Sequence, residues 1–190
     1  FLPKQDVPAG RAPSFVVMSD VNGDGHADLA VSNYLGSTVS VLLGKGDGTF
    51  LPKRDFPTGR FSAALAVGDV NGDGHADLAV ANDFVDNTVS VLLGRGDGTF
   101  LPTQDVPTGR GPRSVAVGDV NGDGHLDLVA ANLDDNTVSV LLGRGDGTFL
   151  PKQDVPTGGG PQSVALGDVN GDGRLDLAVA NQSQSDSTVS

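Results

Sequence analysis

The chain has 190 residues, enough for one domain with a sizeable core, and it contains 28 glycines and 11 prolines. Its formal net charge is −12, and it has no basic stripe that could neutralise phosphates, which argues against nucleic acid as a ligand. Cysteine is absent, so disulfides and thiol chemistry are excluded, and no apolar run approaches the length of a membrane span.

In chain order, the sequence opens with a predicted strand at residues 1–7 and then repeats one unit every 49 or 50 residues. The third copy shows the unit most clearly. Its predicted strands are residues 114–118, 127–131, 137–142 and 149–155, with a hairpin turn at 143–147. Several short strands repeated at this period are typical of a β-propeller.

We therefore expect an all-β fold, a propeller of about four antiparallel blades with four strands each. The repeat units are residues 1–49, 50–99, 100–148 and 149–190, and the last is incomplete. The first strand of a unit is rich in small residues, as at 63–68, which suits the crowded position that lines the channel. The fourth strand contains Pro52, Pro102 or Pro151, which predicts the outer edge, because proline cannot donate to a strand ladder.

A nine-residue, aspartate-rich loop joins the first two strands of every unit. The copies are residues 20–28, 69–77, 119–127 and 168–176. Each places oxygen-bearing side chains at positions 1, 3, 5 and 9 and a glycine at position 6, which is how a short loop surrounds a hard cation such as Ca²⁺. Position 12 of an EF-hand would be a glutamate, but this chain contains none and continues from each loop into a β-branched run.

Position 7 of such a loop normally binds the ion through its backbone carbonyl. A histidine fills this position in three loops and an arginine in the fourth, so we expect the side chains to face solvent and not to bind zinc. One Ca²⁺ per loop is the predicted cofactor. The predicted ligands are Asp20, Asn22, Asp24, His26 and Asp28; Asp69, Asn71, Asp73, His75 and Asp77; Asp119, Asn121, Asp123, His125 and Asp127; and Asp168, Asn170, Asp172, Arg174 and Asp176.

With its recurring Asp-Val-Asn-Gly-Asp-Gly loop in register with the repeat, the chain resembles the FG-GAP/VCBS repeat family over essentially its whole length. These are the calcium-binding propeller blades of integrin α-subunit heads and of many bacterial surface and secreted proteins. The Phe-Gly and Gly-Ala-Pro signatures are only loosely represented, for example at 111–112 and 160–161, so the bacterial branch is the closer resemblance. The resemblance implies Ca²⁺ binding in the loops and an extracellular or cell-surface location.

Three classes of function are compatible with this pattern. The first is a non-catalytic, calcium-stabilised scaffold for adhesion-like contacts with a protein or a surface. The second is a lectin, although the chain has no tryptophan and a single tyrosine, Tyr34, to stack on a sugar. The third is an accessory domain of a secreted enzyme; no catalytic set of residues stands outside the repeat, so we expect no enzymatic activity in this segment.

The variable loops between the second and third strands are the best candidates for contacting a protein or glycan ligand. They are residues 34–36, 83–86, 133–135 and 182–186. The two ends of the sequence also complement each other, because the strand at 1–7 has no upstream blade and the unit ending at Ser190 lacks its outer strand. We therefore expect a homo-oligomer or a part of a larger propeller.

Overall fold

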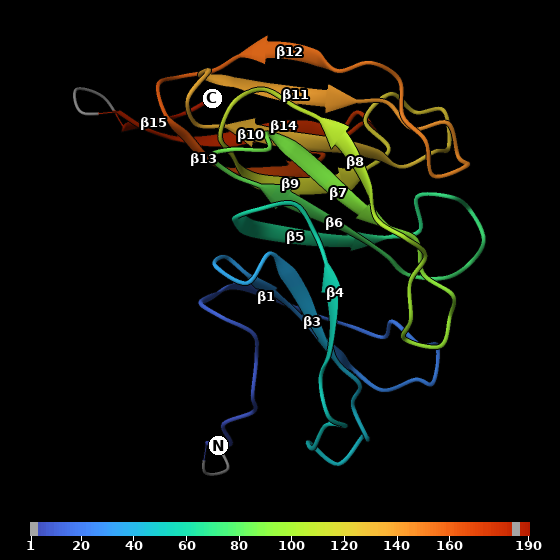
Figure 1. Cartoon of the computed structure of the whole chain (residues 1–190). Helices are drawn as coiled ribbons and strands as arrows, with labels where there is room; N and C mark the ends of the chain where they lie inside the picture. Colours follow the sequence, from blue (N-terminus) through green and yellow to red (C-terminus); the bar gives the residue numbers. More distant parts are fainter. Residues whose placement is uncertain (1–3, 184–186) are drawn as a thin grey trace.

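The structure, a computed structural model, describes residues 4–183 and 187–190, and this part of the chain is all-β (Figure 1). Its fifteen strands form four antiparallel sheets. They are β1 (Pro13–Ser19), β2 (Asp28–Asn33), β3 (Thr38–Leu42) and β4 (Arg54–Pro57); β5 (Ser62–Gly68), β6 (Asp77–Asn82), β7 (Thr88–Leu92) and β8 (Gln104–Pro107); β9 (Pro112–Gly118), β10 (Asp127–Asn132), β11 (Thr137–Leu141) and β12 (Gln153–Pro156); and β13 (Pro161–Gly167), β14 (Asp176–Gln182) and β15 (Ser187–Val189).

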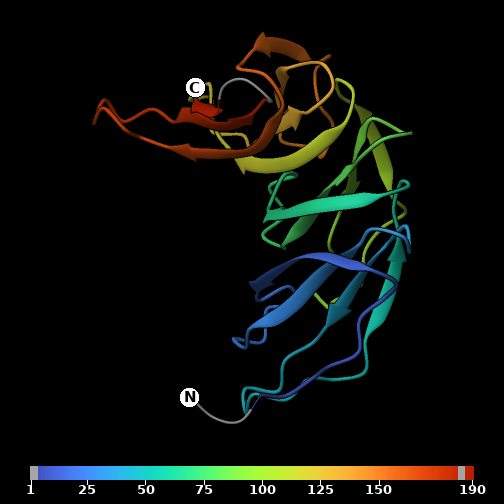
Figure 2. The ribbon, with the colours of Figure 1, turned by 90° about the vertical axis from the view of Figure 1, so that its left-hand side faces the viewer.

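The four sheets are the blades of an incomplete propeller. Strands follow one another in sequence order within each blade, from β1 to β4 in the first and from β13 to β15 in the last. The first strands of neighbouring blades, β1, β5, β9 and β13, contact one another in turn, so they line the inner side of the arc as expected. Figure 2 shows the blades arranged as an open crescent, with the two ends of the chain at its two tips.

The core lies between the blades, in three hydrophobic clusters that each span one junction. In the junction of blades 1 and 2, for example, Val39 and Val41 pack in the same cluster as Leu65 and Leu78. Alternating side chains along each strand face the two neighbouring blades, so the second strands of the middle blades are buried on both faces. This arrangement explains why those strands read as continuous small and apolar runs.

A buried polar network accompanies the apolar core in each blade. In blade 2, Asn82 Nδ2 donates to Ser90 Oγ (2.8 Å), and Ser90 Oγ donates to Asp105 Oδ1 (2.6 Å). The backbone amide of Gly59 also donates to Ser90 Oγ (3.0 Å), which ties the start of the blade to its third strand. Blades 1 and 3 repeat the Asn–Ser–Asp series at equivalent positions. The buried serine in the third strand is therefore satisfied by hydrogen bonds to its neighbours, which allows it to lie in the core.

The fourth strands confirm the predicted outer position but begin later than predicted. A single bridge, Gly143 to Phe149 in blade 3, closes the hairpin, and the ladder resumes only at Gln153, after Pro151. Pro52 and Pro102 precede β4 and β8 in the same way. The proline interrupts the ladder because it has no N–H to donate, so it lies outside the strand and not in its middle.

The predicted N-terminal strand is not formed in the described residues. Residues 1–3 lie outside the described part, and residues 4–12 contain no strand. Residues 4–12 therefore do not complete blade 4 within the same chain, since β13, β14 and β15 form a three-stranded sheet without them. Each sheet also begins at a first strand, so the blades are displaced along the chain from the repeat units at 1–49, 50–99, 100–148 and 149–190. Within residues 4–183 and 187–190, no helix has the length and apolar character required to cross a bilayer.

Candidate functional site

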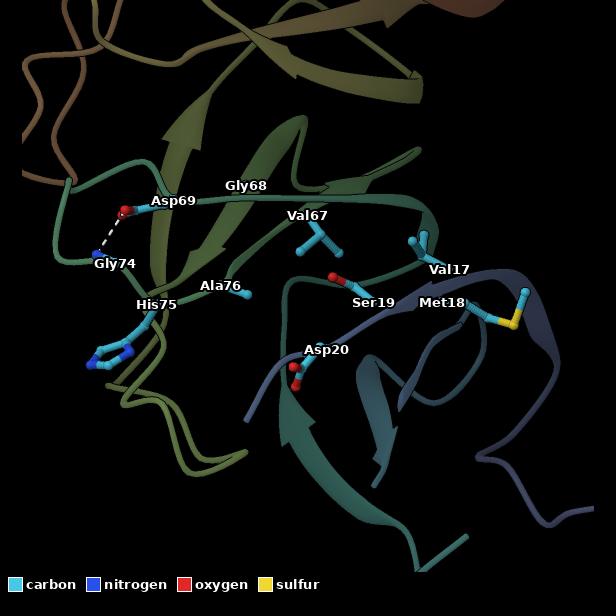
Figure 3. Close-up of a pocket in the computed structure, with 10 residues that line it drawn as sticks. All are labelled: Val17, Met18, Ser19, Asp20, Val67, Gly68, Asp69, Gly74, His75 and Ala76. Atoms are coloured by element: carbon cyan, nitrogen blue, oxygen red, sulfur yellow. Dashed lines mark hydrogen bonds between the residues drawn. The ribbon is translucent and has the colours of Figure 1, made fainter. Parts of the chain in front are cut away.

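The four aspartate-rich loops adopt the same compact conformation. In the second loop the opening aspartate, Asp69, accepts hydrogen bonds at Oδ1 from the amide of Gly72 (2.8 Å) and at Oδ2 from the amide of Gly74 (2.8 Å). Figure 3 shows the second of these bonds. Asn71 Nδ2 donates to Asp73 Oδ2 (3.0 Å), so the side chains at positions 3 and 5 are adjacent. The glycines at positions 4 and 6 have positive φ angles, which permits the tight turn.

The aspartate at position 9 is buried and fastens the loop to the blade. Asp77 is only 1% exposed. Its Oδ2 accepts from the amide of Val70 (2.8 Å), and its Oδ1 accepts from the amide of Gly94 at the start of the hairpin (2.6 Å). Burial raises the pKa of Asp77, and the two amide hydrogen bonds oppose that rise. Sequence reasoning assigned this residue to the metal alone, but in the structure it also joins the loop to the turn between β7 and β8, and Asp28 and Asp127 do the same.

The position 7 side chains are exposed, but they are not free of contacts. The imidazole of His75 lies against Gly96 of the hairpin, so closely that a Cβ on this glycine would overlap the ring. His26 and His125 cover Gly46 and Gly145 in the same manner. In Figure 3 the His75 ring points away from the Asp69 carboxylate. The histidines therefore pack on the neighbouring turn, a role that the sequence analysis missed and that the co-occurrence of His and a Gly-rich turn in the first three units could have suggested.

The loops offer the oxygen chemistry that suits Ca²⁺, and the residues present fit this ion by type. In the described residues, however, no three acidic or histidine side chains converge closely enough to hold a metal. The carboxylates at positions 1, 5 and 9 instead accept hydrogen bonds from backbone amides. The amide of His75 and the side chain of Asn71 lower the pKa of Asp73, because both donate hydrogen bonds that favour its ionised form. An ionised oxygen cluster of this kind is a hard donor set.

A cleft of about 500 Å³ separates the loops of blades 1 and 2 on the inner side of the arc. Figure 3 shows its lining, which includes the opening aspartates Asp20 and Asp69 and the side chains of Val17 and Val67. These valines come from the first strands β1 and β5. The cleft brings the beginnings of two aspartate-rich loops to one opening, so a change in either loop alters its wall.

The face opposite the aspartate-rich loops carries a cluster of three aromatic rings. Antiparallel pairing places the turn between the second and third strands at the other end of β2 and β6 from those loops. There the Tyr34 and Phe61 ring centroids lie 5.3 Å apart, and the Phe61 and Phe84 centroids 6.3 Å apart. Phe84 is 70% exposed. We call the cluster of Tyr34, Phe61 and Phe84 the aromatic platform. It joins blades 1 and 2.

Two residues of the aromatic platform have left-handed backbones. Phe61 has a φ of 59° and Phe84 a φ of 67°. The positions equivalent to Phe61 in blades 3 and 4 are Gly111 and Gly160, which accept a positive φ without strain. An aromatic residue in this conformation costs free energy, so its presence at this position requires another advantage. The sequence analysis named the loops that contain Tyr34 and Phe84, at residues 34–36 and 83–86, but it did not name Phe61.

A buried ion pair lies beneath the aromatic platform. Asp83 is 1% exposed, and its Oδ2 lies 3.1 Å from Arg113 Nε in β9. The hydroxyl of Tyr34 donates to the same oxygen (3.2 Å). This network joins side chains from blades 1, 2 and 3. The pKa of Tyr34 is raised, mainly because its hydroxyl is buried and also because the negative charge of Asp83 lies beside it.

The comparisons with known proteins agree on the architecture. A family profile described as the FG-GAP-like repeat matches residues 20–80, 69–130 and 119–179. No curated protein sequence matches the chain. Among solved structures, a lectin from Agrocybe aegerita that recognises non-reducing terminal N-acetylglucosamine has a TM-score of 0.60 at 24% identity, over 91% of this chain and 50% of the lectin.

Two further solved structures are similar. The V. cholerae biofilm matrix protein Bap1 has a TM-score of 0.58 at 18% identity, over 94% of this chain and 26% of that one. The Photorhabdus luminescens Tc holotoxin pore has a TM-score of 0.56 at 21% identity, over 89% of this chain and 8% of that one. These likenesses concern the fold. The chain spans about half the length of the lectin and less of the other two.

Proposed function

The chain belongs to the FG-GAP-like repeat family, and on that premise we propose that it is a non-catalytic, calcium-stabilised propeller scaffold that binds a partner outside the cell. The observation that carries the proposal is the contrast between its two faces. One face repeats the same aspartate-rich loop in every blade, while the other carries the aromatic platform at a single place. A repeated feature serves the stability of all blades, whereas a feature that occurs once serves a specific contact.

In this proposal each loop holds one Ca²⁺ through its side chains at positions 1, 3, 5 and 9 and the carbonyl of position 7. In the second loop these are Asp69, Asn71, Asp73, Asp77 and the carbonyl of His75. The ion supplies positive charge to three neighbouring carboxylates. The residues of the loop orient those oxygens: the glycine amides hold Asp69, and the amides of Val70 and Gly94 hold Asp77.

The same contacts support a non-catalytic role. A general base needs a carboxylate that can give up and accept a proton at the substrate, and the loop carboxylates are engaged by backbone amides. The family resemblance and the wholly aspartate-based acidity, which calcium would offset, support a location outside the cell, where free Ca²⁺ is abundant.

The aromatic platform supplies the proposed partner-binding surface. Phe84 offers an exposed ring that packs against Phe61, and Phe61 in turn packs against Tyr34. Aromatic side chains of this kind are enriched where proteins contact partners. The test is to compare the wild-type chain with Phe61→Gly and Phe84→Ser on arrays of glycans and of secreted proteins, with Leu51→Ser as the control. Leu51 is also an exposed apolar residue, but it lies outside the aromatic platform.

We expect ligands of the wild type to be lost by both platform variants and retained by the control. Phe61→Gly restores the residue found at the equivalent positions of blades 3 and 4, so its fold should be preserved. Equal binding by all four proteins would contradict the proposed surface. Loss of binding by Leu51→Ser alone would place the surface elsewhere.

Carbohydrate binding is a second candidate function, and the Tyr34 and Phe61 rings favour it. A sugar stacks on an aromatic ring while its hydroxyls bond to exposed polar groups, and the exposed side chain of Arg60 directly precedes Phe61 in the chain. The lectin of similar fold recognises a terminal N-acetylglucosamine, so this sugar is the first to titrate. Chemical-shift changes at the aromatic platform that saturate with the sugar would support the lectin function, and their absence would favour a protein partner.

A further inference from the structure

An arginine recurs shortly before the first strand of the first three blades, at the face that carries the aromatic platform. These residues are Arg11, Arg60 and Arg110, and each follows a glycine. The strands β1, β5 and β9 begin two residues after them. The aspartate-rich loops follow the other ends of the same strands, so their negative charge lies away from the three arginines.

In blades 2 and 3 a carboxylate from the same blade binds this arginine at two points. Asp86 Oδ2 accepts from the backbone amide of Arg60 (2.6 Å), and Asp86 Oδ1 accepts from the guanidinium Nη2 (2.8 Å). Asp135 binds Arg110 in the same way, at 2.7 Å from the amide and 2.7 Å from Nε. Both aspartates lie in the turn between the second and third strands of their blade. The repeat thus builds a site in which one amide and one guanidinium hold a carboxylate.

Blade 1 has the same arginine and a matching turn but no carboxylate at this place. Its turn is as long as that of blade 3, and Gly36 stands where Asp135 does. The next residues, Ser37 and Asn136, have φ angles of 53° and 55°, so the two turns share a conformation. A Cβ added to Gly36 would lie 3.4 Å from the amide nitrogen of Arg11. Among the described residues, neither the amide nor the guanidinium of Arg11 has a hydrogen-bond or ion-pair partner.

The unpaired arginine of blade 1 does not depend on what precedes that blade. Arg60 and Arg110 each have a preceding blade, yet their side chains are 61% and 69% exposed, and their acidic partners come from their own blades. The preceding blade contacts the next residue instead, as Asn87 Oδ1 does at the amide of Gly111 (2.9 Å). The difference in blade 1 therefore comes from the glycine in its own turn.

We propose that Arg11 and the turn at residues 34–36 bind the carboxylate of an acidic side chain in a protein partner. The proposal rests on the partner-binding face proposed above and gives the partner a chemistry. One carboxylate oxygen accepts from the Arg11 amide and the other from its guanidinium, as Asp135 does at Arg110. A protein side chain is the occupant, because the group that fills the equivalent site in blades 2 and 3 is itself an aspartate on a peptide turn.

The surroundings of Arg11 suit a peptide more than a free acid. Leu35 beside it is 47% exposed. The carbonyl of Ala12 accepts from the amide of Tyr34 (2.8 Å), so the site adjoins the aromatic platform. An exposed ion pair alone contributes little to binding, and apolar neighbours of the acidic residue would add contacts with this surface.

The experiment follows the backbone amide and Nε–H signals of the arginines by NMR, at constant Ca²⁺, while a peptide is added. The peptide is a capped tripeptide with an aspartate between two leucines. We expect both signals of Arg11 to shift and saturate, whereas Arg60 and Arg110 stay unchanged because internal carboxylates occupy them. The same peptide with asparagine in place of the aspartate is the control, and it should bind at least about tenfold more weakly.

Gly36→Asp supplies the carboxylate from within the chain. We expect this variant to fold, because Asp135 occupies the same position of an equal turn, and to lose the peptide response at Arg11. Gly36→Ala is the matched control, since it adds the Cβ without the charge, and it should bind the peptide like the wild type. Arg11→Gln should also lose the peptide, which tests the site without any change in the turn.

Several results would overturn the proposal. No response at Arg11, equal shifts at all three arginines, or equal affinity for the aspartate and asparagine peptides would show that the site does not select a carboxylate. Glucuronate that binds at Arg11 as tightly as the peptide would assign the site to an acidic sugar. Protein ligands on the arrays that depend on the aromatic platform but bind Arg11→Gln normally would keep the proposed function and overturn the acidic partner alone. A saturable response at Arg11 without any platform-dependent ligand would support this site and contradict the platform surface.

Discussion

Asp83 and Arg113 form an ion pair across the junction of blades 2 and 3, with Oδ2 and Nε 3.1 Å apart and the carboxylate almost wholly buried. The Nε hydrogen does not align well enough for a hydrogen bond, and Asp83 Oδ1 has no hydrogen-bond partner among the described residues. The charge of Arg113 therefore compensates the buried carboxylate together with the hydroxyl of Tyr34, which donates to Asp83 Oδ2. It also links the base of the aromatic platform to the third blade.

Removing Arg113 should destabilise the fold strongly. Arg113→Ala leaves the buried Asp83 without an opposite charge and with only the Tyr34 hydroxyl as a partner, and breaking a buried pair in this way typically costs about 3–5 kcal/mol in the free energy of unfolding. The control is Arg60→Ala, which removes an exposed pair with Asp86 and should cost less than about 1 kcal/mol. Urea unfolding monitored by circular dichroism measures both. Equal losses of unfolding free energy in Arg113→Ala and Arg60→Ala would contradict the expected difference between the buried and the exposed ion pair.

The exposed pair of Arg60 and Asp86 should contribute to acid sensitivity. The hydrogen bonds from Arg60 lower the pKa of Asp86 in the folded state. The resulting stability is present above the ordinary aspartate pKa of about 3.9 and is lost as the pH falls through the lower, folded value. Asp86→Asn removes this titration, so the stability of the variant should fall less steeply between about pH 4 and the acid transition than that of the wild type. Curves of stability against pH that run parallel for the wild type and Asp86→Asn would exclude this contribution of Asp86.

Substitutions within one loop should separate metal binding from folding. Asp73→Ala removes a carboxylate at position 5 and should weaken one calcium site while leaving the calcium-free protein about as stable as before. His75→Ala keeps the position 7 carbonyl and should barely change calcium affinity. Calorimetric titration of both variants, beside melting curves in chelator, measures the difference. Equal losses of affinity would show that the imidazole takes part in binding.

Substituting Asp77, at position 9 of the loop, should destabilise the calcium-free protein, unlike substituting Asp73 at position 5. Asp77→Ala leaves the buried amides of Val70 and Gly94 without acceptors, and each such group costs about 1–3 kcal/mol. We therefore expect Asp77→Ala to lower the melting temperature even in excess chelator. A melting temperature that falls only in the presence of calcium would assign Asp77 to the metal alone.

Much of the fold was predictable from the sequence because several independent features of the repeat indicate the same structure. The period, the loop and the small-residue first strand all indicate propeller blades, and the structure confirms the strand order within them. The start of the fourth strand was not predictable from the alternation alone, since Pro151 interrupts the ladder at a position that reads as strand. Residues 4–7 of the predicted N-terminal strand form no strand for another reason: a strand needs a neighbour to pair with, and none of the described sheets includes these residues.

The candidate site was predictable in its residue types and less so in its contacts. The spacing of Asp69, Asn71 and Asp73 indicates an oxygen-lined loop, and these side chains do gather in one turn. The clamp formed by Asp77 depends on Gly94, which is distant in sequence and is brought near only by the hairpin. The aromatic platform was hidden for the same reason, because Tyr34 comes from one unit and Phe61 and Phe84 from the next, and only the fold brings the three rings together.

If every blade carries one calcium site, as proposed, the number of Ca²⁺ ions bound per chain is the most direct measurement. Native mass spectrometry in calcium acetate, compared with equilibrium dialysis, gives this number without assuming an affinity. One site in each of the four loops predicts four ions per chain and three in Asp73→Ala. A chain that binds no calcium, and whose melting curve is unchanged by chelator, would contradict the account.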